Sequence, residues 1–426
     1  MFETEKTKEL AQSGDPEAQY ALGRMYGDET PPDHEEAAKW YRLSAEQGHP
    51  GGQNSLGFLY GTGNGVSLDH KEAVRWYRLS AEQGHPGGQS NLGLAYSKGE
   101  GVPQDLEEAA KWYRLSAEQG HPGGQYNLGT MYHRGKGVPQ DLEEAAKWYR
   151  LSAEQGHSWG QNNLGTMCQT GKGVPQNLEE AAKWYRLSAE QGNAEAQSNL
   201  GWMYENGAGV PMGKEEAAKW YRLSAEQGNA RAQHSIGLLY WRGEGVPQDH
   251  EETAKWYRLS AEQGNEEAQY GLGWLYESGD GMPMDYEEAA RWYRLSAEQG
   301  NSWAQNNLGW LYENEKGVPM DLEEAAERYI LAAEKGNPWA QYNIGRMYSS
   351  GKGVPQDHEE AARWYLLSAE QGIAAAQNNL GVMYEDGEGV PMDPEEAMRL
   401  YALAAEQGHE MALYNLNRMR QRQEHQ

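Results

Sequence analysis

One glycine spacing constrains this chain more than any other feature of its sequence. Glycines recur at every thirty-sixth residue from Gly48 to Gly408 without a slip, which gives ten consecutive intervals. A fixed period between about 20 and 50 residues is typical of solenoids, propellers and other repeat arrays. We therefore expect a stack of repeated units, although 426 residues would normally indicate two or three separate cores.

The internal pattern of one repeat identifies the unit. In residues 85–120, the first half places apolar residues at helical spacing and then reaches Gly99 and Gly101, which terminate helices. The second half opens with Asp105, a candidate N-cap, and Glu108 completes a capping-box pattern three residues later. Neither half shows the two-residue alternation of a β-strand. Each repeat is therefore predicted to be an antiparallel pair, here called helix A and helix B.

The sequence contains eleven such pairs, with a half-repeat at each end. A helix resembling helix B lies within residues 1–13, and one resembling helix A lies within residues 409–426, so we expect about 24 helices. The predicted organisation is an N-terminal capping helix (1–13), eleven repeats (14–408), and a C-terminal capping helix with a polar tail (409–426). Capping elements with a polar outer face keep solenoids soluble.

Charge and hydropathy exclude several classes of protein. The chain has 37 basic and 64 acidic residues and a formal charge of −27, which argues against nucleic-acid binding. No segment approaches the roughly 18 apolar residues of a membrane span, so we expect no membrane insertion. Residues 1–9 lack the apolar stretch of a secretory signal. We expect a cytoplasmic protein, with a periplasmic or secreted location as the alternative if a leader has been removed.

Polar clusters have structural explanations in this sequence. The paired glutamates that open each helix B suit the positive end of the helix dipole, and the G-x-G loops follow helices rather than strands. Cys168 is the single cysteine, so neither an intrachain disulfide nor a zinc site built from cysteines can form. Successive repeats carry a histidine just before helix A, which we interpret as a surface loop residue: His49, His85, His121 and His157. We predict no metal, no cofactor and no enzymatic activity.

The repeated string A-x-A-Q-x-x-L-G-x-x-Y-x-x-G-x-G-V-P-x-D-x-E-E-A-x-x-W-Y-R-x-x-A-E-Q-G resembles the Sel1-like repeat, a relative of the tetratricopeptide repeat, over roughly residues 14–420. Among the departures, Arg328 and Leu400 replace the tryptophan of helix B, and Asn417 replaces the glycine of the last L-G pair. The resemblance implies an all-α, right-handed α/α superhelical solenoid that acts as an adaptor scaffold. Many bacterial members are secreted with a disulfide in each repeat, and this chain lacks those cysteines.

By analogy with the tetratricopeptide repeat, the concave side of the solenoid presents the second, fifth, ninth and twelfth residues of each helix A. We call these positions the helix-A surface. All seven tryptophans outside helix B lie on it. The candidate partner-binding residues are Tyr126, Trp159, Asn162, Trp202, Glu205, His234, Trp241, Tyr270, Trp274, Glu277, Trp303, Asn306, Trp310, Glu313, Trp339, Tyr342, Arg346 and Asn378.

An aromatic surface with asparagines suits an extended peptide. Tryptophan offers a large contact area at small entropic cost, and a side-chain amide can both donate to and accept from a peptide unit. We expect repeats five to ten of a monomer to bind a protein or peptide segment, acting as a non-enzymatic scaffold. One alternative is that some tryptophans only fill a tightly coiled superhelix. The other is a glycan-binding or cell-envelope polysaccharide component, because exposed aromatic rings also stack on sugars.

Overall fold

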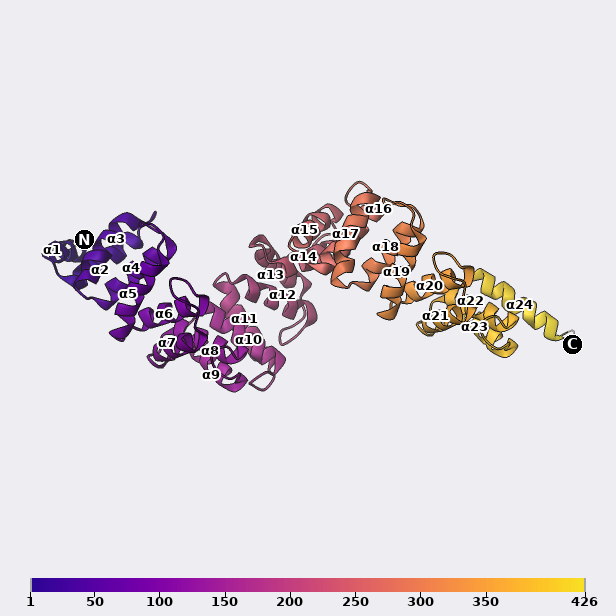
Figure 1. Cartoon of the computed structure of the whole chain (residues 1–426), viewed down its shortest axis with the longest axis horizontal. Helices are drawn as coiled ribbons and strands as arrows, with labels where there is room; N and C mark the ends of the chain where they lie inside the picture. The colour runs from indigo at the N-terminus through magenta and orange to yellow at the C-terminus, as the bar shows by residue number, and fades with distance from the viewer. Residues whose placement is uncertain (1, 425–426) are drawn as a thin grey trace. The chain divides into compact units, whose positions relative to one another are not determined.

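An aspartate is the N-cap of helix B in most repeats, as the sequence indicates. The computed structural model describes residues 2–424, and in that range the chain forms 24 α-helices and no strands (Figure 1). Two compact units divide after Trp220, and we refer to them as unit 1 (up to Trp220) and unit 2 (from Tyr221). The all-α solenoid of helix pairs is confirmed. No described helix is long and apolar enough to cross a bilayer.

The helices alternate between the two predicted types. The A helices are α2 (Pro16–Gly27), α4 (Pro50–Thr62), α6 (Pro86–Lys98), α8 (Pro122–Arg134), α10 (Ser158–Thr170), α12 (Ala194–Asn206), α14 (Ala230–Arg242), α16 (Glu266–Ser278), α18 (Ser302–Glu313), α20 (Pro338–Ser350) and α22 (Ala374–Asp386). The B helices are α3 (His34–Glu46), α5 (His70–Glu82), α7 (Leu106–Glu118), α9 (Leu142–Glu154), α11 (Leu178–Glu190), α13 (Lys214–Glu226), α15 (His250–Glu262), α17 (Tyr286–Gln299), α19 (Leu322–Glu334), α21 (His358–Glu370) and α23 (Pro394–Glu406). Helix α1 (Phe2–Gln12) precedes them and α24 (Glu410–Glu424) follows.

The start of helix B is tied to the helix A before it. Asp105 Oδ1 accepts a hydrogen bond from the Glu108 amide at 2.9 Å, as predicted. The capping box also predicts that the Glu108 side chain accepts from the Asp105 amide, and this part is wrong. The Asp105 amide donates instead to the Tyr96 carbonyl at 3.0 Å, and the Glu108 carboxylate pairs with Lys111 at 2.9 Å. The cap therefore fixes both the start of helix B and its distance from helix A.

The structure corrects our interpretation of the histidines before helix A as surface loop residues. His121 is half-buried and is the N-cap of α8, where its Nδ1 accepts from the Gly124 amide at 3.1 Å. Burial lowers the pKa of His121, which favours the neutral ring that this acceptor role requires. Later repeats place asparagine in the same role, as Asn301 does for α18.

The L-G pair of helix A is explained by contact with helix B. In repeat nine, a Cβ at Gly309 would lie 3.0 Å from two ring atoms of Tyr329, which is fully buried. The missing side chain therefore allows the two helices to approach closely. The same close approach recurs in the other pairs that lie within one unit, and it accounts for the combination of glycine in helix A and tyrosine in helix B.

Neighbouring repeats share their cores. Where helix B has a tryptophan, its ring packs at the junction with the preceding repeat, as Trp292 does in the cluster that contains Tyr257 of the preceding helix B and Leu272 of its own helix A. These tryptophans are therefore packing residues. In unit 1, successive A helices such as α4 and α6 also contact one another directly. Helices that approach one another across the repeats form the inner layer of a curved stack, which places the helix-A surface of α2, α4, α6 and α8 on its concave side.

Candidate interaction surface

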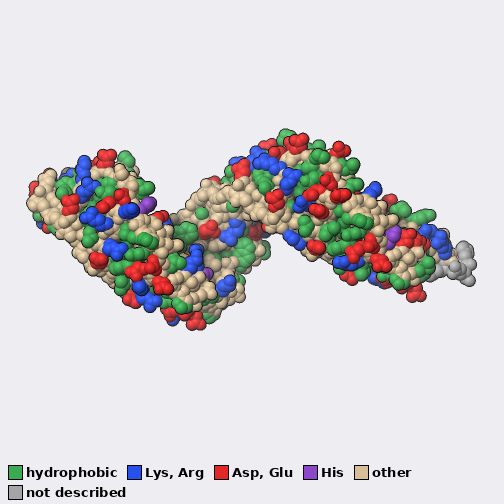
Figure 2. All heavy atoms as spheres, in the orientation of Figure 1, with side chains coloured by type: hydrophobic (Ala, Val, Ile, Leu, Met, Phe, Trp, Pro, Cys, Tyr) green, Lys and Arg blue, Asp and Glu red, His purple; other side chains and the backbone are tan. Residues whose placement is uncertain are grey.

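The tryptophans of the helix-A surface differ in exposure. In unit 1, Trp159 and Trp202 are 46% and 43% exposed. In unit 2, Trp241, Trp303 and Trp339 are 36%, 44% and 46% exposed, whereas Trp274 and Trp310 are half-buried. Large apolar groups with this exposure remain available to a partner, so the structure does not use all seven tryptophans to fill the solenoid. Apolar side chains are interspersed with charged ones on the face of unit 2 shown in Figure 2.

The fifth position of helix A forms the floor of this surface. Tyr126, Tyr270 and Tyr342 are half-buried, and each lies with its ring centroid about 6 Å from that of the helix-B tyrosine of the same repeat. His234 occupies the same position in repeat seven and stacks on Tyr257 at 5.4 Å. One of these rings, Tyr342, also meets the exposed Trp339 edge to face at 6.4 Å.

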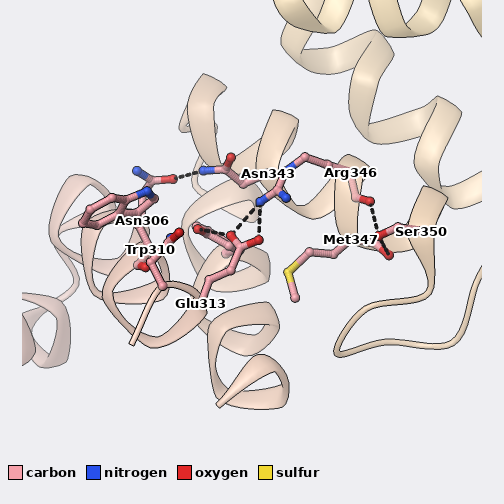
Figure 3. Close-up of polar contacts among 9 residues, drawn as sticks. Asn306, Trp310, Glu313, Asn343, Arg346, Met347 and Ser350 are labelled. Carbon is pink, nitrogen blue, oxygen red and sulfur yellow. Dashed lines mark hydrogen bonds and ion pairs between the residues drawn. The ribbon is translucent and has the colours of Figure 1, made fainter. Parts of the chain in front are cut away.

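The asparagines of this surface form bridges between repeats. Asn162, Asn306 and Asn378 are only 6–8% exposed. Asn306 donates to its neighbour Asn307 at 3.1 Å and accepts from Asn343 of the next repeat at 3.0 Å (Figure 3). The same arrangement links Asn199 to Asn162 and Asn415 to Asn378, each at 3.1 Å. Much of the hydrogen-bonding capacity of these amides is therefore used within the protein, which leaves direct partner contact mainly to the aromatic residues.

The twelfth-position carboxylates are also held within the surface. Glu313 accepts from the Tyr329 hydroxyl at 3.0 Å, and Arg346 Nη2 reaches across from the next repeat to both of its carboxylate oxygens at 2.5 and 2.6 Å (Figure 3). Arg346, predicted as a partner-binding residue, is thus engaged in an ion pair between repeats nine and ten. Sequence reasoning missed this pairing, although the 33-residue spacing between Glu313 and Arg346 recurs between Glu385 and Arg418.

The other two carboxylates have different surroundings. Glu205 lies 3.5 Å from Lys214 Nζ. Glu277 is half-buried and accepts from the Tyr293 hydroxyl at 2.5 Å. Burial raises the pKa of Glu277, and the tyrosine hydrogen bond opposes part of that rise.

A pocket of about 470 Å³ opens in unit 2 among α14, α15 and α16. Its lining includes Trp241 and Trp274, whose rings meet edge to face at 5.8 Å, together with Tyr257, Tyr270 and Gly271. The sixth residue of helix A is Gly271 here, where most repeats have an asparagine. The fifth residue of repeat seven is His234, so no asparagine bridge links repeats seven and eight at the pocket. Sequence reasoning missed Tyr257 and Gly271, although the loss of the asparagine was the available signal.

A smaller apolar region lies in unit 1. Phe58 and Leu94, at the ninth position of repeats two and three, are 50% and 37% exposed. They line hollows of about 180 and 240 Å³ on the helix-A surface, and Phe58 borders both. Our prediction omitted them because it considered only tryptophan, tyrosine and polar side chains.

The Sel1 repeat family matches this chain in eleven segments: residues 16–49, 50–85, 86–121, 122–157, 160–193, 194–229, 230–265, 266–301, 304–337, 340–373 and 374–409. The crystal structure of c5321, a protective antigen of uropathogenic Escherichia coli with an SLR fold, is 39% identical and covers 98% of this chain and 90% of its own, with a TM-score of 0.83. A Sel1 repeat protein from Oxalobacter formigenes is 35% identical and covers 72% of this chain and 89% of its own, with a TM-score of 0.51. No curated protein matches the sequence. The expected family is confirmed by these matches along the whole repeat array: the chain belongs to the Sel1 repeat family.

Proposed function

We propose that this protein is a non-enzymatic interaction scaffold and that the helix-A surface of unit 2 binds an extended segment of a partner protein. The observation that carries the proposal is the aromatic pocket among α14, α15 and α16. Tryptophan is the residue type most enriched where protein interfaces gain their binding energy.

The pocket suits one apolar anchor of the partner. Its volume of about 470 Å³ lies within the range of ligand sites, and the edge-to-face pair of Trp241 and Trp274 supplies an apolar wall. Complete burial of a leucine or phenylalanine side chain is worth about 1.5–3 kcal/mol. The pocket would therefore fix the register of the bound segment.

The exposed tryptophans farther along unit 2 would extend the contact. Trp303 and Trp339 occupy the second position of α18 and α20. Packed helices lie about 8–10 Å apart, and an extended chain advances about 3.3 Å per residue, so each repeat would contact about three residues of the segment. A segment of about twelve residues would span repeats seven to ten.

The proposal is tested with a displayed library of random dodecapeptides, selected on the full chain. The selected peptides are then titrated against the wild type and against the double variant Trp241→Ala/Trp274→Ala. We expect at least a tenfold loss of affinity, since hot-spot truncations cost about 2 kcal/mol or more. The control is Leu295→Ala, which removes an exposed side chain of helix B and should leave affinity unchanged.

Circular dichroism of each variant shows whether the helices are retained. Unchanged peptide affinity in a fully helical double variant would contradict the proposal. So would a selection that yields no peptide while cellohexaose, a β-linked glucose oligomer, changes the tryptophan fluorescence of the wild type. That result would favour sugar recognition instead.

A further inference from the structure

The chain contains its own example of what binds a carboxylate at the twelfth position of helix A. Glu313 and Glu385 each accept from the tyrosine of their own helix B, at 3.0 Å in both repeats. Each also pairs with an arginine from the ninth position of the next helix A: Arg346 contacts Glu313, and Arg418 contacts Glu385 at 2.5 Å. The junction of repeats nine and ten and the junction of repeat eleven with the terminal helix α24 thus place a guanidinium at the same point.

Glu277 has the tyrosine but not the arginine. The ninth residue of the next helix A is Trp310, which brings an indole and no charge to this place. The Tyr293 hydroxyl occupies one oxygen of Glu277 at 2.5 Å, and no Lys or Arg among the described side chains of residues 5–422 forms an ion pair with this carboxylate. Glu277 is nevertheless half-buried. A carboxylate withdrawn from water without a cation is energetically unfavourable, so it favours an incoming positive charge.

A directed series of hydrogen bonds ends at Glu277. Asn343 donates to Asn306, which donates to Asn307. Asn307 then donates to the Tyr293 hydroxyl at 3.1 Å, and Tyr293 donates to Glu277. Each donor points toward the carboxylate, and such a series polarises its members in the same direction. The network fixes Glu277 in one position and leaves the negative charge at its end, on the helix-A surface.

We propose that Glu277 binds the guanidinium of an arginine in the partner segment, with the indole of Trp310 as its stacking surface. This inference rests on the proposed function and specifies the chemistry of the partner. Arginine suits the site better than lysine because its planar fork can pair with both carboxylate oxygens while its face stacks on an aromatic ring. The raised pKa of Glu277, caused first by burial, agrees with a carboxylate whose cation is supplied from outside.

The place of this arginine relative to the pocket follows from helix geometry. Trp274 lines the pocket and precedes Glu277 by three residues in α16, so the two side chains lie on one face about one turn apart. One extended segment can therefore place an apolar anchor in the pocket and an arginine on Glu277 within about two to three residues of each other.

The test uses the dodecapeptide selection on the full chain. We expect the selected peptides to share an arginine at a fixed, short distance from the apolar anchor. Replacing that arginine with citrulline, which keeps the shape and removes the charge, should weaken binding to the wild type about tenfold, or about 1.4 kcal/mol. With Glu277→Gln, which can still accept from Tyr293, the arginine and citrulline peptides should bind equally. Glu298→Gln removes an exposed carboxylate from the last turn of α17 and should leave the tenfold difference intact.

A second variant tests the site without removing the carboxylate. Trp310→Arg reproduces the arrangement of Glu313 with Arg346, so the new side chain should occupy Glu277 and abolish the preference for arginine. Peptides that bind through Trp241 and Trp274 but do not distinguish arginine from citrulline would overturn this inference and leave the proposed function in place. Preserved discrimination in Glu277→Gln would also overturn it. If no peptide binds the wild type, both proposals fail.

Discussion

The ring of Tyr257 is held between two glycines, and filling one of those places should loosen repeats seven and eight. A Cβ at Gly271 would lie 2.6 Å from Tyr257 Cε2 and 2.9 Å from Cδ2, whereas carbon atoms pack best at about 3.5–4.0 Å. The ring would have to retreat by about 1 Å. On its other side it faces Gly237, where a Cβ would lie 2.7 Å away, and the ring is only 6% exposed.

We therefore expect Gly271→Ala to destabilise this part of unit 2. Overpacking costs about 1–3 kcal/mol, and replacing a helical glycine with alanine returns about 1 kcal/mol, so the net loss is about 1 kcal/mol. Stability in a repeat array is largely local, so native-state hydrogen exchange is the appropriate measurement. Amides of α15 and α16 should exchange about fivefold faster.

The matched control is Gly27→Ala at the end of α2, where the added Cβ would lie 3.6 Å from the Tyr41 hydroxyl, an ordinary contact. Exchange in the control should equal that of the wild type or be slower. If Gly271→Ala left exchange in α15 and α16 unchanged, the reasoning from the close approach of Tyr257 would be refuted.

Three further outcomes are expected. In a double-mutant cycle with Glu313→Gln and Arg346→Met, hydrogen exchange of α18 and α20 should give a coupling free energy of about 1 kcal/mol. This value is small because solvent screens the arginine, which is 38% exposed. A coupling free energy of zero would contradict the ion pair. Burial lowers the pKa of His85 and His121 below 6.5, so their neutral caps stabilise the fold above about pH 6.5, and that stability is lost as the pH falls. After correction for intrinsic exchange rates, we expect α6 and α8 to exchange relatively faster at pH 5.5. The asparagine-capped helices of unit 2 should not show this change. Burial raises the pKa of the Cys168 thiol to about 11. Iodoacetamide should therefore label this thiol slowly at pH 8 until the chain is denatured. Rapid labelling of the folded chain would contradict the burial of Cys168.

The helix pairs could be predicted because the signals that specify them are local. Asp105 caps a helix through amides two to three residues away, and glycines such as Gly99 end one with a positive φ of 76°. These features require no knowledge of the neighbouring repeat.

The parts that were missed depend on how one repeat contacts the next. His121 is not a usual N-cap residue, and only its equivalence to Asn301 in a later repeat indicates that role. The ion pair of Arg346 with Glu313 was not predicted, because it depends on the distance between two A helices. The pocket likewise requires Gly271 to lie beside a tyrosine from another helix pair. Spacing within one repeat cannot reveal these contacts, whereas comparison of equivalent positions across repeats can.

Hydrogen exchange with and without a selected dodecapeptide tests the central claim most directly, because it shows where the partner segment lies. We expect slower exchange in α14, α16, α18 and α20, with little change in α15, α17, α19 and α21, and no such pattern in Trp241→Ala/Trp274→Ala. Protection confined to the B helices, or to unit 1, would contradict the claim that the helix-A surface of unit 2 is the binding site.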